Sequence, residues 1–156
     1  MRLPVGAAAA LGWWAAVLPA HPVSARPPPD SLRFTLVAPD SVRVGQPVPL
    51  VLRLTNVTDR PIEAHFLGRE IAFDIVVAQP DGAVVWRRLA RAVVPGILQV
   101  KVLGPGETVE LKDAWRQRTD TGAPAAPGEY VVWGVLPTDA PEPLRTPPAH
   151  LRVLPP

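Results

Sequence analysis

Residues that could carry out catalysis are few in this chain of 156 residues, and they are widely separated. After the first 25 residues the only histidines are His65 and His150, the only serines are Ser31 and Ser41, and cysteine is absent. The sequence leaves a Ser-His-Asp triad open, but it contains no Gly-x-Ser-x-Gly turn to present the serine. Two distant histidines without cysteine make a poor metal site, and no Gly-rich phosphate loop is present. We therefore predict that the protein is not an enzyme, with no catalytic residue, no metal ligand and no cofactor.

One short segment does match a catalytic signature. Asp120-Thr121-Gly122-Ala123 resembles the active-site motif of retroviral and pepsin-type aspartic proteases. Those enzymes place the aspartate after an apolar strand and need a second aspartate, whereas residues 116–119 are polar here. Because such short motifs have many false positives, a surface loop is the preferred interpretation.

Three other groups of residues suggest binding chemistry, and each also has a structural interpretation. Trp86, Trp115 and Trp133 could stack on a carbohydrate, but single tryptophans on separate strands more often lie in a core. The basic cluster of Arg87, Arg88 and Arg91 could bind an anion or simply be a solvated edge. The segment 56–58 fits an N-glycosylation pattern, but we interpret residues 56–61 as a turn.

The charge of the chain argues against a polyanionic partner. The formal net charge is +2, and the charges are scattered along the sequence. A protein this close to neutrality has no strong field for nucleic acid or for an anionic membrane. We expect a protein partner and no nucleic acid.

The N-terminus has the layout of a secretory signal. A basic residue, Arg2, precedes an apolar stretch over residues 5–20, and Val23-Ser24-Ala25 offers small residues for cleavage. We predict a signal peptide over residues 1–25, a Pro-rich leader over 26–30 and one β-sandwich domain over 31–156, exported to the periplasm or the extracellular space. The alternative is an uncleaved anchor, although the apolar stretch is short for a span of about 20 residues. After cleavage we expect no stable membrane insertion.

After the leader, apolar residues recur at every second position in about nine short runs separated by turn signals. This pattern predicts an all-β fold, an immunoglobulin-like antiparallel β-sandwich of about seven to nine strands. Two segments, 116–127 and 137–148, are polar or rich in proline and are predicted to be loops. Pro127-Gly128-Glu129-Tyr130 is typical of a tyrosine corner, in which the hydroxyl binds a backbone group.

Between residues 48 and 136, a series of segments resembles the BsuPI-type intracellular proteinase inhibitor domain. The members of the series are 52–62, Phe66, 73–77, Asp81-Gly82, 85–87, 103–107, Trp115 and 127–130. The resemblance implies an immunoglobulin-like sandwich and inhibition of a serine protease.

An inhibitor of this kind would act through a surface loop held by the sandwich. The candidates are residues 116–127 and residues 91–96, and the side chains we single out are Arg91, Val94, Arg116, Arg118 and Asp120. The alternative from another class is a non-inhibitory binding or assembly module that uses a sheet edge or a tryptophan-bearing face.

Overall fold

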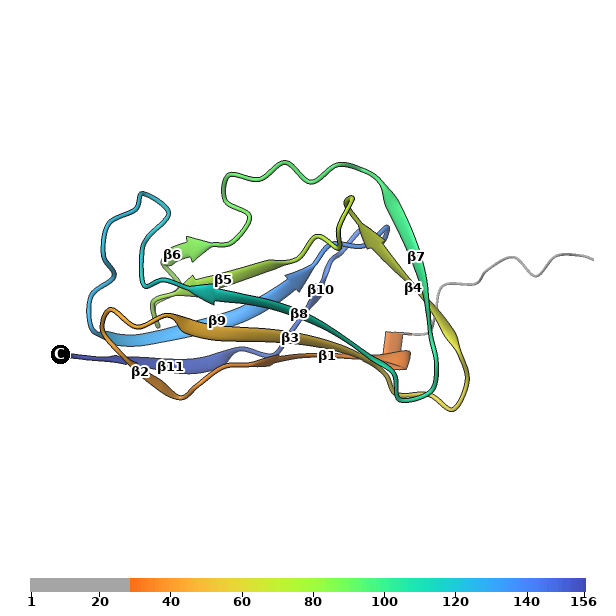
Figure 1. Cartoon of the computed structure of the whole chain (residues 1–156), viewed down its shortest axis with the longest axis horizontal. Coiled ribbons are helices and arrows are strands. Elements are labelled where there is room, and N and C mark those ends of the chain that lie inside the picture. Colours follow the sequence, from red (N-terminus) through yellow and green to blue (C-terminus); the bar gives the residue numbers. More distant parts are fainter. Residues whose placement is uncertain (1–28) are drawn as a thin grey trace, which may run out of the picture.

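The computed structural model describes residues 29–156, and this part of the chain is almost entirely β-structure (Figure 1). A short 3-10 helix, η1 (Pro29–Ser31), precedes eleven strands. In chain order the strands are β1 (Leu32–Val37), β2 (Ser41–Arg43), β3 (Val48–Asn56), β4 (Ile62–Leu67), β5 (Asp74–Ala78), β6 (Val84–Arg87), β7 (Leu98–Leu103), β8 (Thr108–Trp115), β9 (Gly128–Leu136), β10 (Leu144–Arg145) and β11 (Ala149–Leu154). The predicted signal peptide lies outside the described residues.

The strands form three hydrogen-bonded sheets. One has the order β1-β3-β8, and the second has the order β2-β11-β9-β5-β6 with β10 paired to β9. The third is the two-stranded ladder of β4 and β7. All pairs are antiparallel except β2 with β11. The all-β sandwich predicted from the sequence is therefore confirmed, and its immunoglobulin-like character stays a prediction.

Alternating side chains of the two larger sheets meet in the core. On β3 the residues at positions 48, 50, 52 and 54 are fully or almost fully buried, while those between them are partly or fully exposed. Gly134 on β9 faces Leu52, and a Cβ at this glycine would lie 2.3 Å from a Leu52 methyl carbon. The two layers thus approach so closely at this point that a side chain on β9 would displace Leu52.

Two strands were not predicted. β2 directly follows the residues 39–40, where Pro-Asp favours a turn, and β10 lies inside the segment 137–148, which we expected to be a loop. β2 forms because Val42 pairs in parallel with Val153 on β11, and β10 forms because Leu144 pairs with Leu136. Both depend on distant partners, which a local period of two in the sequence does not reveal.

Asn56 connects the main sandwich to the ladder of β4 and β7. Its side chain is fully buried, and its amide nitrogen donates to the carbonyl oxygens of Arg60, Leu103 and Gly104 at 2.8 to 3.0 Å. Its side-chain oxygen accepts from the backbone N–H and the hydroxyl of Thr58. Asn56 thus joins the turn after β3 to the turn before β8 through hydrogen bonds. The turn predicted over residues 56–61 is confirmed.

The predicted tyrosine corner is present. The Tyr130 hydroxyl donates to the carbonyl oxygen of Ala126 at 2.5 Å, and the ring packs edge-on against Trp115 with 5.1 Å between centroids. Trp115 is fully buried, and its ring nitrogen donates to the carbonyl oxygen of Arg118. These contacts fix both ends of the connection between β8 and β9.

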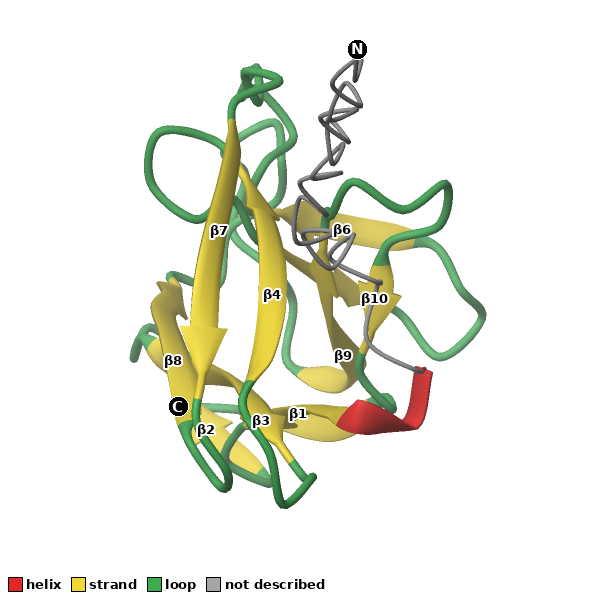
Figure 2. Ribbon diagram, turned by 90° about the vertical axis from the view of Figure 1, so that its right-hand side faces the viewer, coloured by secondary structure: helices red, strands yellow, loops and turns green. Residues whose placement is uncertain are grey.

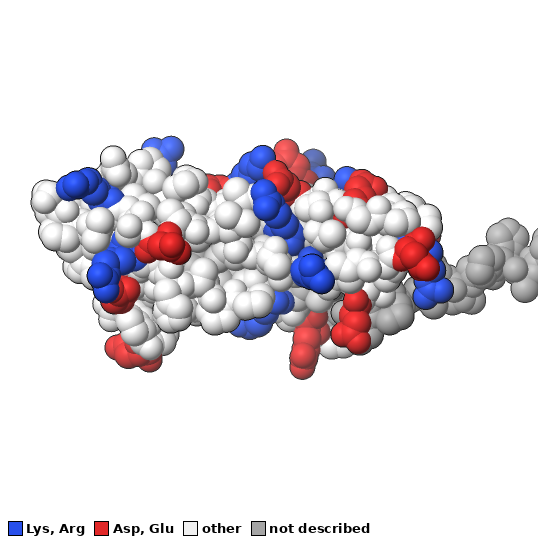
Figure 3. All heavy atoms as spheres, turned by 90° about the horizontal axis from the view of Figure 1, so that it is seen from below, with Lys and Arg blue, Asp and Glu red and all other residues white. Residues whose placement is uncertain are grey.

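The outer surface carries mixed charge. Figure 3 shows basic and acidic side chains interspersed on one face, without a large area of either sign. Between residues 29 and 156, no helix is long and apolar enough to cross a membrane.

Candidate functional site

Two connections leave the β6 end of the sandwich: residues 88–97 between β6 and β7, and residues 116–127 between β8 and β9 (Figure 1). They contain all five side chains that the sequence singled out. The two connections differ in how their backbone groups are used.

Residues 116–127 form a closed hairpin, although the sequence suggested an open loop. The N–H of Thr119 donates to Ala123 at 2.8 Å, that of Gly122 to Thr119 at 2.9 Å, and that of Ala125 to Gln117 at 2.8 Å. The Arg118 guanidinium also donates to the carbonyl oxygen of Gly122. These bonds fold the backbone of the hairpin back on itself.

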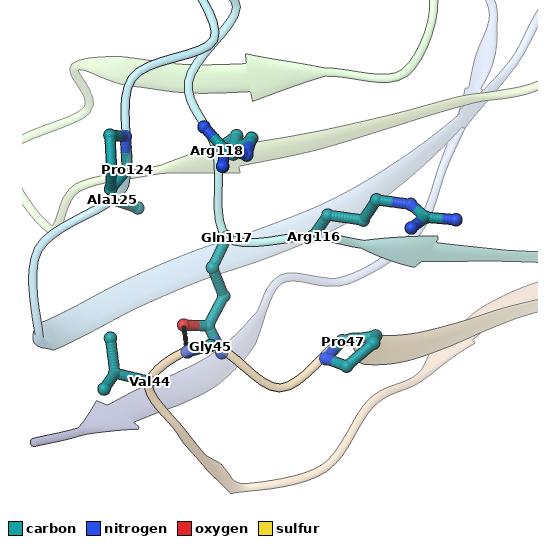
Figure 4. A pocket seen from close by; sticks show the side chains of 8 residues that line it. All are labelled: Val44, Gly45, Pro47, Arg116, Gln117, Arg118, Pro124 and Ala125. Carbon is teal, nitrogen blue, oxygen red and sulfur yellow. Dashed lines mark hydrogen bonds between the residues drawn. The ribbon is translucent and has the colours of Figure 1, made fainter. Parts of the chain in front are cut away.

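Gln117 fixes the hairpin to the sandwich. Its side chain is buried and points at the turn between β2 and β3 (Figure 4). The side-chain oxygen accepts from the N–H of Gly45 at 2.9 Å, and the amide nitrogen donates to the carbonyl oxygens of Arg43 and Gln46 at 2.8 and 2.6 Å. Gln117 also has a φ of 55°, a conformation that costs a residue with a side chain about 1 kcal/mol or more. Nothing in the sequence distinguishes it from its polar neighbours, so sequence reasoning missed it.

Asp120 binds the hairpin to the edge of β6. Its N–H donates to the carbonyl oxygen of Val85 at 3.0 Å, and its carboxylate accepts from the N–H of Arg87 at 2.9 Å. The carbonyl oxygen of Asp120 accepts from the Arg91 guanidinium at 2.9 Å. The Asp-Thr-Gly segment is thus the tip of a hairpin whose aspartate extends the pairing of β6, which agrees with the surface-loop interpretation.

Four of the five predicted residues line one open hollow of about 400 Å³. Arg91, Arg116, Arg118 and Asp120 lie there together with Trp86. A second hollow of about 340 Å³ lies beside Gln117 and Gly45 and shares Arg116 and Arg118 with the first. Figure 4 shows Arg116 and Arg118 extending in different directions, so the two guanidinium groups do not converge on one point.

The basic cluster after β6 is engaged within the protein. Arg87 donates to the buried carboxylate of Asp74 at 2.7 Å, and the same carboxylate accepts from the N–H of Leu89. Arg88 pairs with Asp113 and lies 3.8 Å from the centre of the Phe73 ring. These contacts make the cluster a rigid base for the residues that follow it.

Residues 92–97 are open. The N–H of Ala92 donates to Leu89 at 3.1 Å and the carbonyl oxygen of Ile97 accepts from Gly68 at 2.9 Å. Between these two anchors, no backbone group of residues 93–96 bonds to any part of the chain that the structure describes. Val93 is 93% exposed, whereas the predicted Val94 is half-buried and lines neither hollow. The exposed apolar side chain is therefore Val93 and not the predicted Val94.

The remaining chemistry is sparse. Across residues 29–156, no cluster of histidine, cysteine, aspartate or glutamate could hold a metal ion. His65 binds the carboxylate of Asp139 at 2.9 Å and is mostly covered. Asn56, in the glycosylation pattern, is buried.

The chain belongs to the BsuPI intracellular proteinase inhibitor family, whose model matches residues 36–140. The match includes both the hairpin 116–127 and the open segment 92–97. No curated protein shows a match to the chain.

Several solved structures resemble this one at low identity. The alkylpurine DNA glycosylase AlkC of Pseudomonas fluorescens shares 15% identity with a TM-score of 0.45, over 80% of this chain and 30% of that one. The CARDB domain of the PF1109 protein from Pyrococcus furiosus shares 14% with a TM-score of 0.40, over 79% and 87%. A β-glucosidase from Listeria innocua shares 10% with a TM-score of 0.42, over 78% and 16%. The chain thus spans less than a third of the glycosylase and of the glucosidase, and we infer no function from these similarities.

Proposed function

We propose that this protein inhibits a serine protease by presenting residues 92–97 to the active-site cleft as an extended segment. The observation that carries the proposal is the contrast within this segment: its ends are anchored, its central backbone groups are free, and Val93 is 93% exposed. Membership of a proteinase inhibitor family supports the same function.

Anchored ends explain how such a segment would bind tightly. A loop that is already held in its bound shape loses little conformational entropy when it enters a cleft. The contacts of Asp74 with Arg87 and Leu89 hold the start of the segment, and the bond from Gly68 to Ile97 holds its end. Pro95 restricts the backbone further, because its ring fixes φ.

The free backbone groups of residues 93–96 can pair with the protease. Extended ligands bind a protein edge through main-chain hydrogen bonds, while pockets for side chains provide specificity. Val93 is the side chain that would fill the primary specificity pocket. A small, branched aliphatic residue suits a small apolar pocket and not a deep acidic one.

The hairpin 116–127 supports this segment and does not itself act as the inhibitory loop. Bonds such as those from Thr119 to Ala123 and from Ala125 to Gln117 fold its backbone back on itself, so it does not present an extended segment to a protease. Through Asp120 it holds Arg91, the residue that precedes the open segment.

The test is to titrate the purified protein into a panel of serine proteases, subtilisin-like and elastase-like enzymes included, and to follow residual activity. We expect stoichiometric loss of activity of at least one enzyme with a small apolar pocket, and protection of residues 92–97 from nicking in the complex. If no enzyme of the panel is inhibited, the inhibitor proposal fails and a non-inhibitory binding module takes its place.

We further propose that the protein acts outside the cytoplasm, although its family is named intracellular. The proposal is supported by the signal-like order of basic, apolar and small residues over 1–25. Fractionation of cells with N-terminal sequencing tests it. A mature chain that begins at Arg26 in the exported fraction is expected, and a cytoplasmic chain that begins at Met1 would refute it.

A further inference from the structure

Exposed apolar side chains are concentrated in one stretch of the chain. Eight large apolar residues between positions 29 and 156 are strongly exposed, and five of them fall within ten consecutive positions. These five are Val93, Ile97, Leu98, Val100 and Val102. Val93 belongs to the open segment described above, but the last three lie on strand β7 and have no role in it.

β7 contributes little to the core. Of its six residues only Leu103 is buried, and Leu98, Val100 and Val102 are 48%, 52% and 57% exposed. Among residues 29–156 its one strand neighbour is β4, as Figure 2 shows. A two-stranded ladder is marginal by itself and is stabilised by a third strand.

The free edge of β7 offers hydrogen-bonding groups from the same three residues. In an antiparallel ladder, hydrogen-bonded and non-hydrogen-bonded pairs alternate. Gly68 donates to Ile97 at 2.9 Å, which makes this a hydrogen-bonded pair in the register of β4 with β7. It follows that residues 99, 101 and 103 direct their backbone groups at β4, whereas Leu98, Val100 and Val102 direct theirs away from it.

Two other edge strands of the sandwich, β6 and β8, are protected. The edge of β6 is occupied by Asp120, which bonds to Val85 and Arg87. β8 carries exposed charges at Glu110, Lys112 and Asp113, a feature that discourages strand addition. Glu110 is also held ionised, because Lys112 and Arg53 lower the pKa of its carboxyl.

We propose that β7 pairs antiparallel with β7 of a second copy of this chain, with the two-fold axis at Val100. The reason for choosing a second copy is that the strand complements itself. In this register Val100 lies opposite Val100 of the other copy, and Leu98 lies opposite Val102, so that every exposed apolar residue of the strand meets another one. The interface is isologous and therefore closes at two copies.

The charge pattern selects the same register. Lys101, on the opposite face, meets the neutral Gln99 of the other copy when the axis lies at Val100. An axis at Lys101 would place two lysines directly opposite each other, which is destabilising. The pairing joins two marginal ladders into one four-stranded sheet of the order β4-β7-β7-β4. Residues 92–96 lie beyond the paired strands at opposite ends, so the dimer does not rest on the proposed inhibition.

The absence of cysteine from the chain allows a direct test. Val100→Cys places two thiols on a hydrogen-bonded pair, whose Cα atoms are about 5.5 Å apart, within the range of about 4.4–6.8 Å that a disulfide bridges. Val84→Cys is the matched control, because Val84 is 51% exposed on the edge strand β6. Under mild oxidation we expect disulfide-linked dimers of Val100→Cys to form at least about tenfold faster, since pairing raises the effective thiol concentration. Equal rates for the two variants would overturn the proposal.

Analytical ultracentrifugation over a wide range of protein concentrations provides a second test, because it measures the fraction of dimer. We expect the unmodified protein to dimerise, and Val100→Lys to weaken the dimer about tenfold by opposing two charges. Lys101→Glu should leave the dimer unchanged, because its partner is neutral Gln99. A protein that stays monomeric at all concentrations would overturn the proposal. So would a dimer whose dissociation constant is unchanged by Val100→Lys.

Discussion

Residues 116–127 and residues 92–97 belong to the two connections that begin at β8 and β6, and their hydrogen bonding and exposure are the reverse of what their composition suggests. The first is polar and would be expected to be solvated, yet it is closed by backbone bonds and fixed by the buried Gln117. The second is more apolar, yet Val93 is almost fully exposed, and no backbone group of residues 93–96 bonds to the part of the chain that the structure describes. Under the proposed function, the use of backbone groups, more than residue type, separates the supporting loop from the binding loop. Substitutions in each segment test this division of roles.

The largest expected effect is on stability and concerns Gln117. Gln117→Ala removes three hydrogen bonds to residues 43–46, which should cost about 3 kcal/mol of unfolding free energy at about 1 kcal/mol for each bond. Urea denaturation measures the loss. Gln117→Gly is the control, because glycine tolerates the φ of 55° and should recover about 1 kcal/mol relative to alanine. A loss below about 1 kcal/mol in the alanine variant would show that the hairpin is not fixed in this way.

The next effect is on inhibition and concerns Val93. Val93→Asp should weaken inhibition about 100-fold or more, because a charge would enter an apolar pocket at the centre of the interface. The unfolding free energy should change by less than about 0.5 kcal/mol, as for other exposed positions. The inhibition constant and the denaturation midpoint are the two measurements. An inhibitor unaffected by this change would shift the inhibitory role back to the hairpin.

A smaller effect is expected where the two connections meet. Arg91→Ala removes the bond to the carbonyl oxygen of Asp120, so the open segment loses one of its supports. We expect inhibition to weaken about fivefold, which corresponds to ordering about one additional flexible group on binding. Arg145→Ala, an exposed arginine on β10, is the matched control and should leave the inhibition constant unchanged. Equal behaviour of the two variants would mean that the hairpin does not support the segment.

The smallest effect concerns the tyrosine corner, at the far end of the hairpin. Tyr130→Phe removes the hydrogen bond to Ala126 and should cost about 1 kcal/mol at neutral pH. Burial raises the pKa of the Tyr130 hydroxyl above its ordinary value of 10.0. The stabilisation is therefore fully present below about pH 10 and is lost as the pH rises towards the folded-state pKa. The difference in unfolding free energy between the two proteins should shrink above about pH 10, and a constant difference would contradict this account.

Much of the fold could be predicted from the sequence, because it depends on local patterns. The period of two in residues such as Leu50, Leu52 and Leu54 places them on the buried face of β3, and the segment before Tyr130 predicts its corner. The short strands β2 and β10 could not be predicted, since each exists only through pairing with a strand far away in the sequence.

The candidate site was only partly predictable. Arg91, Arg116, Arg118 and Asp120 come together in one hollow as a group, but Val94 does not join them. Gln117 gave no signal, because its role depends on a turn 72 residues away. The exposure of Val93 beside the half-buried Val94 could not be predicted either, since it depends on how the surrounding backbone is anchored.

The most direct test of the central claim, that residues 92–97 are the inhibitory segment, is an exchange of specificity. Val93→Arg should create inhibition of a trypsin-like protease, whose primary pocket is acidic, and abolish inhibition of the enzyme with a small apolar pocket. Val57→Arg is the matched control, because Val57 is 42% exposed in the turn after β3, on a different loop. The account predicts that Val93→Arg alone changes the target. The same inhibition profile for both variants would contradict it.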